Sequence, residues 1–333
     1  MLEEQAIVVT GAAGFVGANL VKGLNARGHD RIIAVDDLSQ GDMIANLADC
    51  DICDYVDRDE FLERLRDGDF DDHVGAILHQ GACSDTMESD GRYMMRNNYR
   101  YSVSLLEHCQ DNDIPLLYAS SASVYGAGSV FREERACEQP LNVYGYSKFL
   151  FDEYVRRTIA DRTAPIVGLR YFNVFGPREH HKGRMASVAM HFFDQYVGAG
   201  RVNLFEGTGG YADGEQRRDF VHVDDVVAVN LWFLDQPRLS GIFNVGTGRA
   251  ATFNAMAVAV INAIEARRGG PRRELATMVS DRAIGYVPLP PALKGRYQSF
   301  TEADVSALRG AGYGAPFLTL EEGVDRYVER MMA

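Results

Sequence analysis

The stretch Thr10-Gly11-Ala12-Ala13-Gly14-Phe15-Val16-Gly17 (TGAAGFVG) decides the fold of this chain. It follows a β-branched apolar run at residues 6–10 (AIVVT) and precedes a segment of helical character at residues 19–26. A second apolar run follows at residues 31–35 (RIIAV). Glycines at this spacing permit a tight turn, a close approach of phosphate to the backbone and close packing of helix on strand. The stretch therefore predicts a dinucleotide-binding loop that contains Gly11, Gly14 and Gly17.

Further apolar runs recur at helix-length intervals, at residues 75–78, 115–119, 166–169 and 241–245. This alternation predicts an α/β fold with a doubly wound parallel sheet of the Rossmann type. From about Asn173 the rhythm breaks, and residues 207–214 (GTGGYADG) have the composition of a long loop. We predict a dinucleotide-binding domain of residues 1–171, to which residues 222–247 return. Residues 172–221 and 248–333 are predicted to form a smaller substrate-binding α/β lobe.

The charge and composition exclude several classes of partner. The 333 residues carry a formal net charge of −13, which argues against an extended surface for nucleic acid or an anionic membrane. No stretch reaches the ~18 uninterrupted apolar residues of a membrane span, and Glu3 and Glu4 stand where a signal peptide would be basic. Five cysteines in a chain of this length do not predict a disulfide framework, and Cys50 and Cys53 lack the second pair that a zinc site needs. We expect a cytoplasmic protein without a metal.

The end of the second predicted strand carries the acidic residue that a dinucleotide site needs. Asp36 stands about 20 residues beyond the glycines, where a carboxylate accepts hydrogen bonds from the ribose hydroxyls of adenosine. Asp36 and Asp37 together would repel a 2′-phosphate, while Arg58 could compensate for that repulsion. The residues themselves therefore leave the choice between NAD and NADP open.

A second motif carries proton chemistry. In Tyr144-Gly145-Tyr146-Ser147-Lys148 the residues Tyr144 and Lys148 are four apart, so on a helix they lie on one face. A phenol is a poor base at neutral pH, but a neighbouring ammonium and an oxidised nicotinamide stabilise its phenolate. The serine run at residues 120–123 follows a predicted strand, and Ser121 is our candidate for the hydroxyl donor.

Taken together, the TGxxGxxG, SSxSVYG and YxxxK motifs resemble the extended short-chain dehydrogenase/reductase family, over nearly the whole chain. Two further segments, residues 81–98 (GACSDT to MMRNN) and 171–188 (YFNVFGPREHHKGRMASV), are similar to the heptose 6-epimerases of that family, which act on ADP-bound heptose. The resemblance implies inversion at C6″ of ADP-heptose by transient oxidation, for the inner core of lipopolysaccharide. It also implies NADP as cofactor, with NAD as the alternative, and a homo-oligomer, most often a pentamer.

The resemblance also implies roles for individual residues. Tyr144 and Lys182 correspond to the two proton-transfer groups, assisted by Ser121 and Lys148. The residues implied to contact the cofactor are Gly11, Gly14, Phe15, Val16, Gly17, Asp36, Asp37, Arg58, Gln80, Gly81, Ala82, Cys83, Ser84, Asn97, Lys148, Val174 and Lys182. The residues implied to contact the ADP-sugar are Asn173, Arg184, His191, Phe205, Glu206, Gly207, Thr208, Arg218 and Tyr297.

Two other hypotheses remain beside this one. The first is a UDP-sugar 4-epimerase or a nucleotide-sugar dehydratase on the same scaffold. Dehydratases of this kind usually carry an acidic pair beside the catalytic serine, and here Ala122 and Ser123 follow Ser121. The second is a dinucleotide-binding sensor without catalysis, against which the Tyr144 and Lys148 pair argues.

Overall fold

A computed structural model describes residues 5–290 and 298–333 of the chain. Within those residues, a seven-stranded parallel sheet has the order β10-β6-β5-β4-β1-β2-β3. Its strands are β1 (Ala6–Thr10), β2 (Ile32–Asp36), β3 (Asp54–Asp57), β4 (Val74–His79), β5 (Leu116–Ser121), β6 (Ile166–Tyr171) and β10 (Gly241–Val245). The predicted α/β fold with a doubly wound parallel sheet is confirmed.

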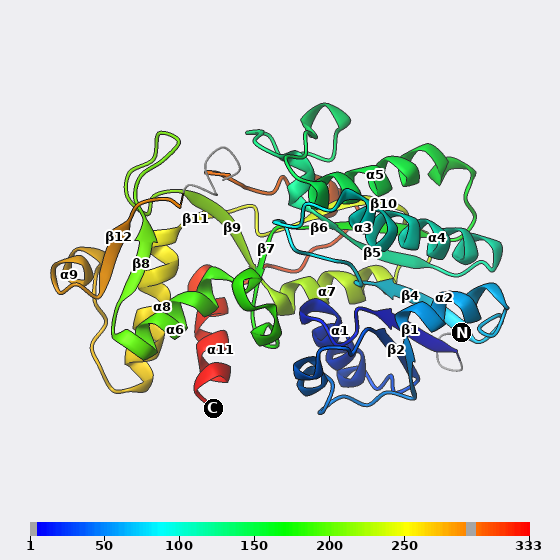
Figure 1. Cartoon of the computed structure of the whole chain (residues 1–333), viewed down its shortest axis with the longest axis horizontal. Coiled ribbons are helices and arrows are strands. Elements are labelled where there is room, and N and C mark those ends of the chain that lie inside the picture. The colour runs from blue at the N-terminus through cyan, green and yellow to red at the C-terminus, as the bar shows by residue number, and fades with distance from the viewer. Residues whose placement is uncertain (1–4, 291–297) are drawn as a thin grey trace.

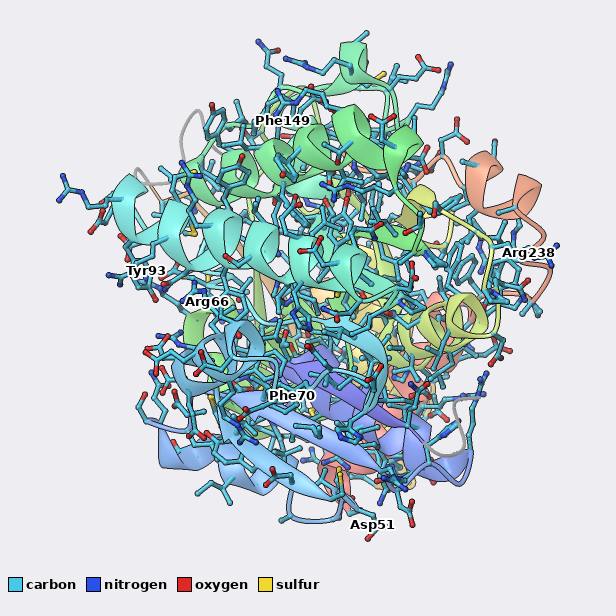
Figure 2. The ribbon with its side chains drawn as sticks, turned by 90° about the vertical axis from the view of Figure 1, so that its right-hand side faces the viewer. Asp51, Arg66, Phe70, Tyr93, Phe149 and Arg238 are labelled. Carbon is cyan, nitrogen blue, oxygen red and sulfur yellow. The ribbon has the colours of Figure 1, made fainter. Side chains whose placement is uncertain are left out.

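Both faces of the sheet are covered by helices, which is why most of its strands, unlike the edge strand β3, are continuous apolar runs. In β1, Ile7 and Val9 pack into one core together with α1 and α7, whereas Ala6 and Val8 pack into the opposite core with α2, α4 and α5. Figure 2 shows α4 and α5 lying side by side across one face. The helices are α1 (Phe15–Ala26), α2 (Arg58–Arg66), α3 (Gly91–Met94), α4 (Tyr101–Asp111), α5 (Val143–Thr158) and α7 (Val223–Leu234).

A smaller lobe lies beside this sheet, at the left in Figure 1. Within the described residues it contains a three-stranded sheet of order β11-β9-β7 and a pair of parallel strands, β12 and β8. The strands are β7 (Asn173–Phe175), β8 (Val202–Phe205), β9 (Arg217–His222), β11 (Ala250–Thr252) and β12 (Ile284–Val287). The later helices are α6 (Val188–Ala199), α8 (Phe253–Arg267), α9 (Leu275–Ser280), α10 (Ser306–Gly310) and α11 (Leu320–Met332).

Two local features differ from the sequence prediction. The strand β3 was not predicted, because its sequence DYVD offers a single apolar side chain, Val56, to the core. Helix α1 begins at Phe15, four residues before the helical segment that we expected, because the phosphate loop turns directly into the helix. No helix among residues 5–290 and 298–333 has the length and apolar character to cross a membrane.

Candidate active site

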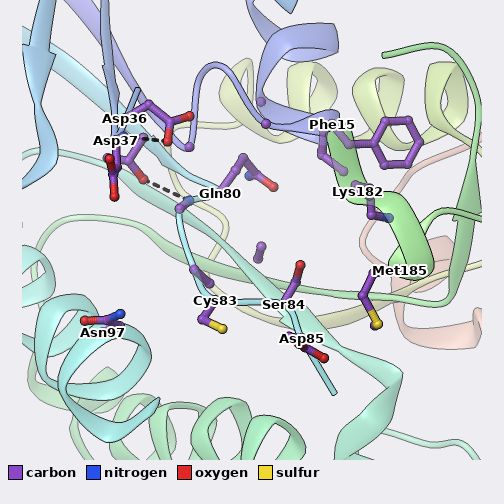
Figure 3. Close-up of a pocket in the computed structure, with 18 of the residues that line it drawn as sticks. Phe15, Asp36, Asp37, Gln80, Cys83, Ser84, Asp85, Asn97, Lys182 and Met185 are labelled. Atoms are coloured by element: carbon purple, nitrogen blue, oxygen red, sulfur yellow. Dashed lines mark hydrogen bonds between the residues drawn. The ribbon is translucent and has the colours of Figure 1, made fainter. Parts of the chain in front are cut away.

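A cavity of about 620 Å³ lies at the carboxyl ends of the parallel strands, where ligands bind in doubly wound sheets. Its walls come from the β1–α1 loop, the ends of β2, β4 and β5, the start of α5 and the loop at residues 181–185. Figure 3 shows Asp36 and Asp37 on one side of this cavity and Lys182 and Met185 on the other. The sheet thus places residues that are distant in sequence around one space.

The glycine loop fits a dinucleotide phosphate. Gly11 has φ +66°, a conformation that favours glycine, and a Cβ added there would lie 2.6 Å from the Gly81 nitrogen. A Cβ on Gly17 would overlap the carbonyl oxygen of Gly11, so helix and loop could not pack as they do. The loop is therefore open to backbone approach at the N-terminus of α1, where the helix dipole stabilises an anion.

A buried amide in the lining also fits a polar ligand. Tyr171 donates a hydrogen bond to Gln80 Oε1 at 2.9 Å, which fixes the orientation of the Gln80 amide. Its Nε2 atom is buried and has no hydrogen-bond partner among the described residues. Such an orphan donor is costly in a folded protein unless a ligand satisfies it. Together with the glycine loop, this indicates that the residues present fit a nicotinamide dinucleotide.

The adenosine end of the cavity lies at β2 and β3. The Asp36 carboxylate accepts hydrogen bonds from the backbone nitrogens of Ala13 at 2.7 Å and Asp37 at 2.8 Å, and burial raises its pKa. Arg58 Nη2 lies 3.5 Å from Asp37 Oδ2, and Arg58 Nε lies 3.7 Å from Asp59 Oδ1. The guanidinium that could compensate for a 2′-phosphate is thus already engaged by two carboxylates.

The opposite end carries the residues that the sequence predicts for proton transfer. Tyr144 lies in the first turn of α5, which Asn142 caps by accepting a hydrogen bond from the Gly145 nitrogen at 2.7 Å. Ser121 lies at the end of β5, and a hydrogen bond joins its side chain to that of Tyr144. Burial raises the pKa of Tyr144, while this hydrogen bond acts in the lowering direction. We had expected Lys148 to lower the pKa of Tyr144, but burial outweighs any such effect.

Lys148 is one helical turn beyond Tyr144 and is buried. Its ammonium donates a hydrogen bond to the carbonyl oxygen of Ala119, at 2.8 Å, in the neighbouring strand β5. Burial lowers the pKa of Lys148 to about 8, and the Asp152 carboxylate acts in the raising direction. Lys148 therefore changes charge near neutral pH, unlike an exposed lysine.

Lys182 enters the cavity from the other lobe, on the turn η6 (His180–Met185). Its Nζ atom lies 4.9 Å from the centre of the Phe15 ring and 4.0 Å from the buried Glu179 carboxylate. Burial lowers the pKa of Lys182, and Glu179 acts in the raising direction. Two nearby arginines pair with carboxylates instead, Arg184 with Asp85 at 2.6 Å and Arg178 with Asp49, and neither is a cause of the lowered pKa of Lys182.

A hydrogen-bonded chain behind the cavity ties the glycine loop to α5. Thr10 Oγ1 contacts His79 Nδ1 at 2.6 Å, and His79 Nε2 contacts Ser102 Oγ at 2.8 Å. Burial lowers the pKa of His79 to about 3, so the imidazole is neutral at physiological pH. Asn98 then donates to the Cys83 carbonyl oxygen at 2.9 Å and to Ser147 Oγ at 3.0 Å. These hydrogen bonds join the wall of the cavity to α5.

The structure brings most of the predicted site residues to this one cavity. Its lining includes all four candidates for catalysis and every residue implied to contact the cofactor, together with Arg184. The lining residues that sequence reasoning did not place at the site are Thr10, Val35, Ser39, Gln40, Met43, Asp59, Asp85, Tyr93, Tyr101, Ala119, Ser120, Tyr171, Phe172, His181 and Met185. Ser120 belongs to the serine run that the sequence places after a strand, although only Ser121 was named for the site, and Ser39 lies three residues beyond the end of β2.

Of the other residues implied to contact the sugar, those that the structure describes do not line this cavity. Asn173 begins β7 and accepts a hydrogen bond from Thr301 Oγ1 at 3.3 Å. The guanidinium of Arg218, in β9, lies 5.7 Å from the centre of the Phe253 ring. The remaining residues lie on α6 and on β8 with the loop after it: His191, Phe205, Glu206, Gly207 and Thr208. Tyr297 lies outside the described residues.

Comparisons with known proteins agree with this architecture. The sequence profile of the NAD dependent epimerase/dehydratase family matches residues 7–246. The chain is 63% identical over 328 residues to the ADP-L-glycero-D-manno-heptose-6-epimerase of Thiobacillus denitrificans, covering 98% of this chain and 99% of that protein. It is also similar to the crystal structure of the Helicobacter pylori ADP-L-glycero-D-manno-heptose-6-epimerase, with a TM-score of 0.83, 29% identity and coverage of 100% and 97%.

A second similar structure contains a cofactor. The UDP-glucose 4-epimerase of Thermus thermophilus in complex with NAD has a TM-score of 0.77 and 26% identity, with coverage of 98% of this chain and 99% of that one. The matched profile spans the glycine loop, the serine run and the Tyr144 and Lys148 pair. The chain belongs to the NAD dependent epimerase/dehydratase family, whose cofactor is a nicotinamide dinucleotide.

Proposed function

We propose that this protein is an isomerase that inverts C6″ of ADP-D-glycero-D-manno-heptose to give the L-glycero epimer. One observation supports the proposal above all others: the cavity that the glycine loop lines is also lined by Ser121, Tyr144, Lys148 and Lys182. The 63% identity to a heptose 6-epimerase over nearly the whole chain supports this choice of substrate over a UDP-hexose.

The need for a cofactor follows from the substrate. A sugar carbon that bears a hydroxyl has no acidic C–H, so its configuration cannot be inverted by proton transfer alone. A nicotinamide bound here supplies the reversible acceptance of a hydride from that carbon. The protein must then move the hydroxyl proton, hold the carbonyl oxygen and keep water away.

Tyr144 is positioned to exchange the hydroxyl proton of the substrate. Ser121 is hydrogen-bonded to it and can hold the same oxygen, which fits a donor that stabilises developing negative charge. Lys148, in its charged form, stabilises the phenolate of Tyr144 one helical turn away. Because burial raises the pKa of Tyr144, this stabilisation by Lys148 is required for the phenol to act as a base.

Lys182 is proposed as the second proton-transfer group. Inversion requires the carbonyl oxygen to point in a different direction in each half-reaction, so one acid/base residue cannot serve both. Lys182 comes from the opposite lobe, and its pKa is lowered by burial, which increases its neutral fraction near physiological pH. It therefore offers a base on the side of the cavity away from Asp36 (Figure 3).

The rest of the assignment extends the same proposal. Residues 1–171 and 222–247 form the dinucleotide domain, and residues 172–221 and 248–333 form the substrate lobe. The ADP-sugar is bound by Asn173, His191, residues 205–208, Arg218 and Tyr297. The planar guanidinium of Arg218 suits binding of a phosphate group, because it can donate two parallel hydrogen bonds. We further propose a cytoplasmic homo-oligomer, a pentamer by resemblance, that supplies heptose for the lipopolysaccharide inner core. The resemblance implies NADP, and the adenosine end of the cavity bears on that choice.

An epimerisation assay tests the proposed function. The purified protein is incubated with ADP-D-glycero-D-manno-heptose without any added reductant, and proton NMR follows the C6″ configuration. We expect an equilibrium mixture of the two epimers and no net change in cofactor. No conversion of ADP-heptose, together with turnover of UDP-glucose, would show that the UDP-sugar 4-epimerase hypothesis is the correct one.

A further inference from the structure

The adenosine end of the cavity carries an excess of carboxylates. Among the described lining residues, Asp36, Asp37 and Asp59 lie there with the guanidinium of Arg58. The other residues that line the cavity after β2 are Ser39, Gln40 and Met43, and none of these is charged. The basic residues Lys148, Lys182 and Arg184 come from elements on the far side of the cavity.

Asp36 has the geometry that recognises ribose hydroxyls. It ends β2, and each of its oxygens accepts one backbone hydrogen bond, from Ala13 or Asp37. A carboxylate oxygen can accept a second hydrogen bond, and a ribose 2′-hydroxyl is a donor suited to it. A 2′-phosphate has no such proton to donate when fully ionised, and it would place its charge against the same carboxylate.

Arg58 could offset that repulsion only in competition with two carboxylates. Its Nη2 atom lies 3.5 Å from Asp37, and its Nε atom lies 3.7 Å from Asp59. The Asp37 side chain also accepts a hydrogen bond from the Ser39 nitrogen at 2.9 Å, which keeps it facing this end of the cavity. Hydrogen bonding by Ser39, followed by Arg58, lowers the pKa of Asp37, so this residue is an anion at neutral pH. A 2′-phosphate would have to compete with two carboxylates for one guanidinium.

We propose that Asp37, through its ion pair with Arg58, makes this protein select NAD over NADP. This selection rests on the dinucleotide site of the proposed function and is independent of the sugar substrate. It is opposite to the cofactor that the family resemblance implies. The charges of Asp36, Asp37 and Arg58 act on the 2′-position of the adenosine ribose. The proposal therefore concerns binding of the cofactor and not the reaction at the opposite end of the cavity.

An exchange experiment on the purified full-length protein tests the selection. The protein is equilibrated with an equimolar mixture of NAD and NADP and passed through a desalting column, and the nucleotide released on denaturation is quantified by mass spectrometry. We expect bound NAD to exceed bound NADP by about tenfold or more, the scale of one unneutralised charge near an ionic ligand. Equal binding, or an excess of NADP, would overturn the proposal while leaving the epimerase function intact.

Variants assign the effect to named residues. Asp37→Asn releases Arg58 and should shift the ratio toward NADP by about tenfold, and Asp37→Asn with Met43→Lys should shift it further. Asp54→Asn is the matched control, because it removes one charge from the exposed start of β3 and should leave the ratio unchanged. If Asp37→Asn and Asp54→Asn gave the same ratio as the unchanged protein, Asp37 would not be the selecting residue.

The experiment also separates this proposal from the one on which it rests. If neither nucleotide is retained or exchanged, the dinucleotide site itself is refuted, and the proposed function falls with it. If NAD is retained but ADP-heptose is not epimerised, the substrate assignment is wrong and the cofactor selection stands. A thermal unfolding curve for each variant checks that a changed ratio reflects binding in a folded protein.

Discussion

The two ends of the cavity are built in opposite ways. The end at β2 and β3 is acidic and partly exposed, and Arg58, Asp37 and Asp59 meet there at distances of 3.5 and 3.7 Å. The opposite end, between α5 and the turn η6, holds Lys148 and Lys182, and burial lowers the pKa of both. Exposed charges are screened by solvent, whereas the pKa of a buried ionisable group in a cavity is shifted, as proton transfer near neutral pH requires. Substitutions at the two ends should therefore change different measured quantities.

The largest expected effect is at the end that holds Lys148 and Lys182. Tyr144→Phe removes the hydroxyl that we propose exchanges the substrate proton, and we expect turnover to fall by about 10³-fold, within the range for general acid–base catalysis. Bound nicotinamide, quantified by mass spectrometry, should stay the same. Tyr146→Phe is the matched control, because Tyr146 lies on the same helix with 46% of its surface exposed, and its turnover should not change. Near-normal turnover in Tyr144→Phe would remove this residue from the mechanism.

The next effect tests the second base. Lys182→Met keeps an apolar stem against Phe15 but removes the amine, and we expect turnover to fall by about 10²-fold with cofactor retained. Lys22→Met serves as the control, since Lys22 is exposed and paired with Asp49 outside the cavity. Rates are measured by NMR on ADP-heptose. If Lys182→Met were as active as the control Lys22→Met, Lys182 would not be needed, and a single acid/base residue would suffice for both half-reactions.

A smaller effect follows from the charge of Lys148. Its pKa of about 8 means that the ammonium is present below that pH and is lost above it. Turnover should therefore fall as pH rises through about 8, approaching tenfold per pH unit. Lys148→Arg keeps the charge at high pH, so its lower rate should no longer fall in this range. A decline at the same pH in both proteins would assign the titration to another group.

The smallest effect belongs to an exposed ion pair in the lining of the cavity. Arg184 and Asp85 lie 2.6 Å apart, but 71% of the Arg184 side chain is exposed. Exposed pairs contribute about 0–1 kcal/mol, so Asp85→Asn should change the affinity for cofactor by less than about fivefold. Equilibrium titration of NAD measures this change. A loss of a hundredfold would show that the pair closes the cavity over its ligand.

The residues on short motifs were predictable from sequence because local chain geometry places them. Gly11 and Gly17 follow from the turn between β1 and α1, and Tyr144 and Lys148 follow from the period of one helix. Such features depend on a few neighbouring residues and hold in any fold that contains them. The parallel sheet was likewise predictable, since most of its strands are continuous apolar runs.

Other features depend on contacts that no local pattern encodes. The strand β3 is held by pairing with β2, and its sequence DYVD has no strand signal apart from Val56 and Tyr55. His79 and Asn98 join the glycine loop to α5 through partners 69 and 49 residues away. The ion pairs of Arg58 with Asp37 and Asp59 could not be predicted from the sequence either, so the cofactor prediction followed the resemblance, which implies NADP. Residues Asn173 and Arg218 were assigned to the sugar by resemblance, and that assignment stays a prediction.

The central claim is that the protein inverts a carbon by removing and returning the same hydrogen. Epimerisation of ADP-heptose in D₂O, followed by proton NMR and mass spectrometry of the product, tests it directly. We predict that the C6″ position of the product contains no deuterium, because the hydrogen never exchanges with solvent. Incorporation of deuterium at C6″ during turnover would contradict the account and indicate inversion by deprotonation.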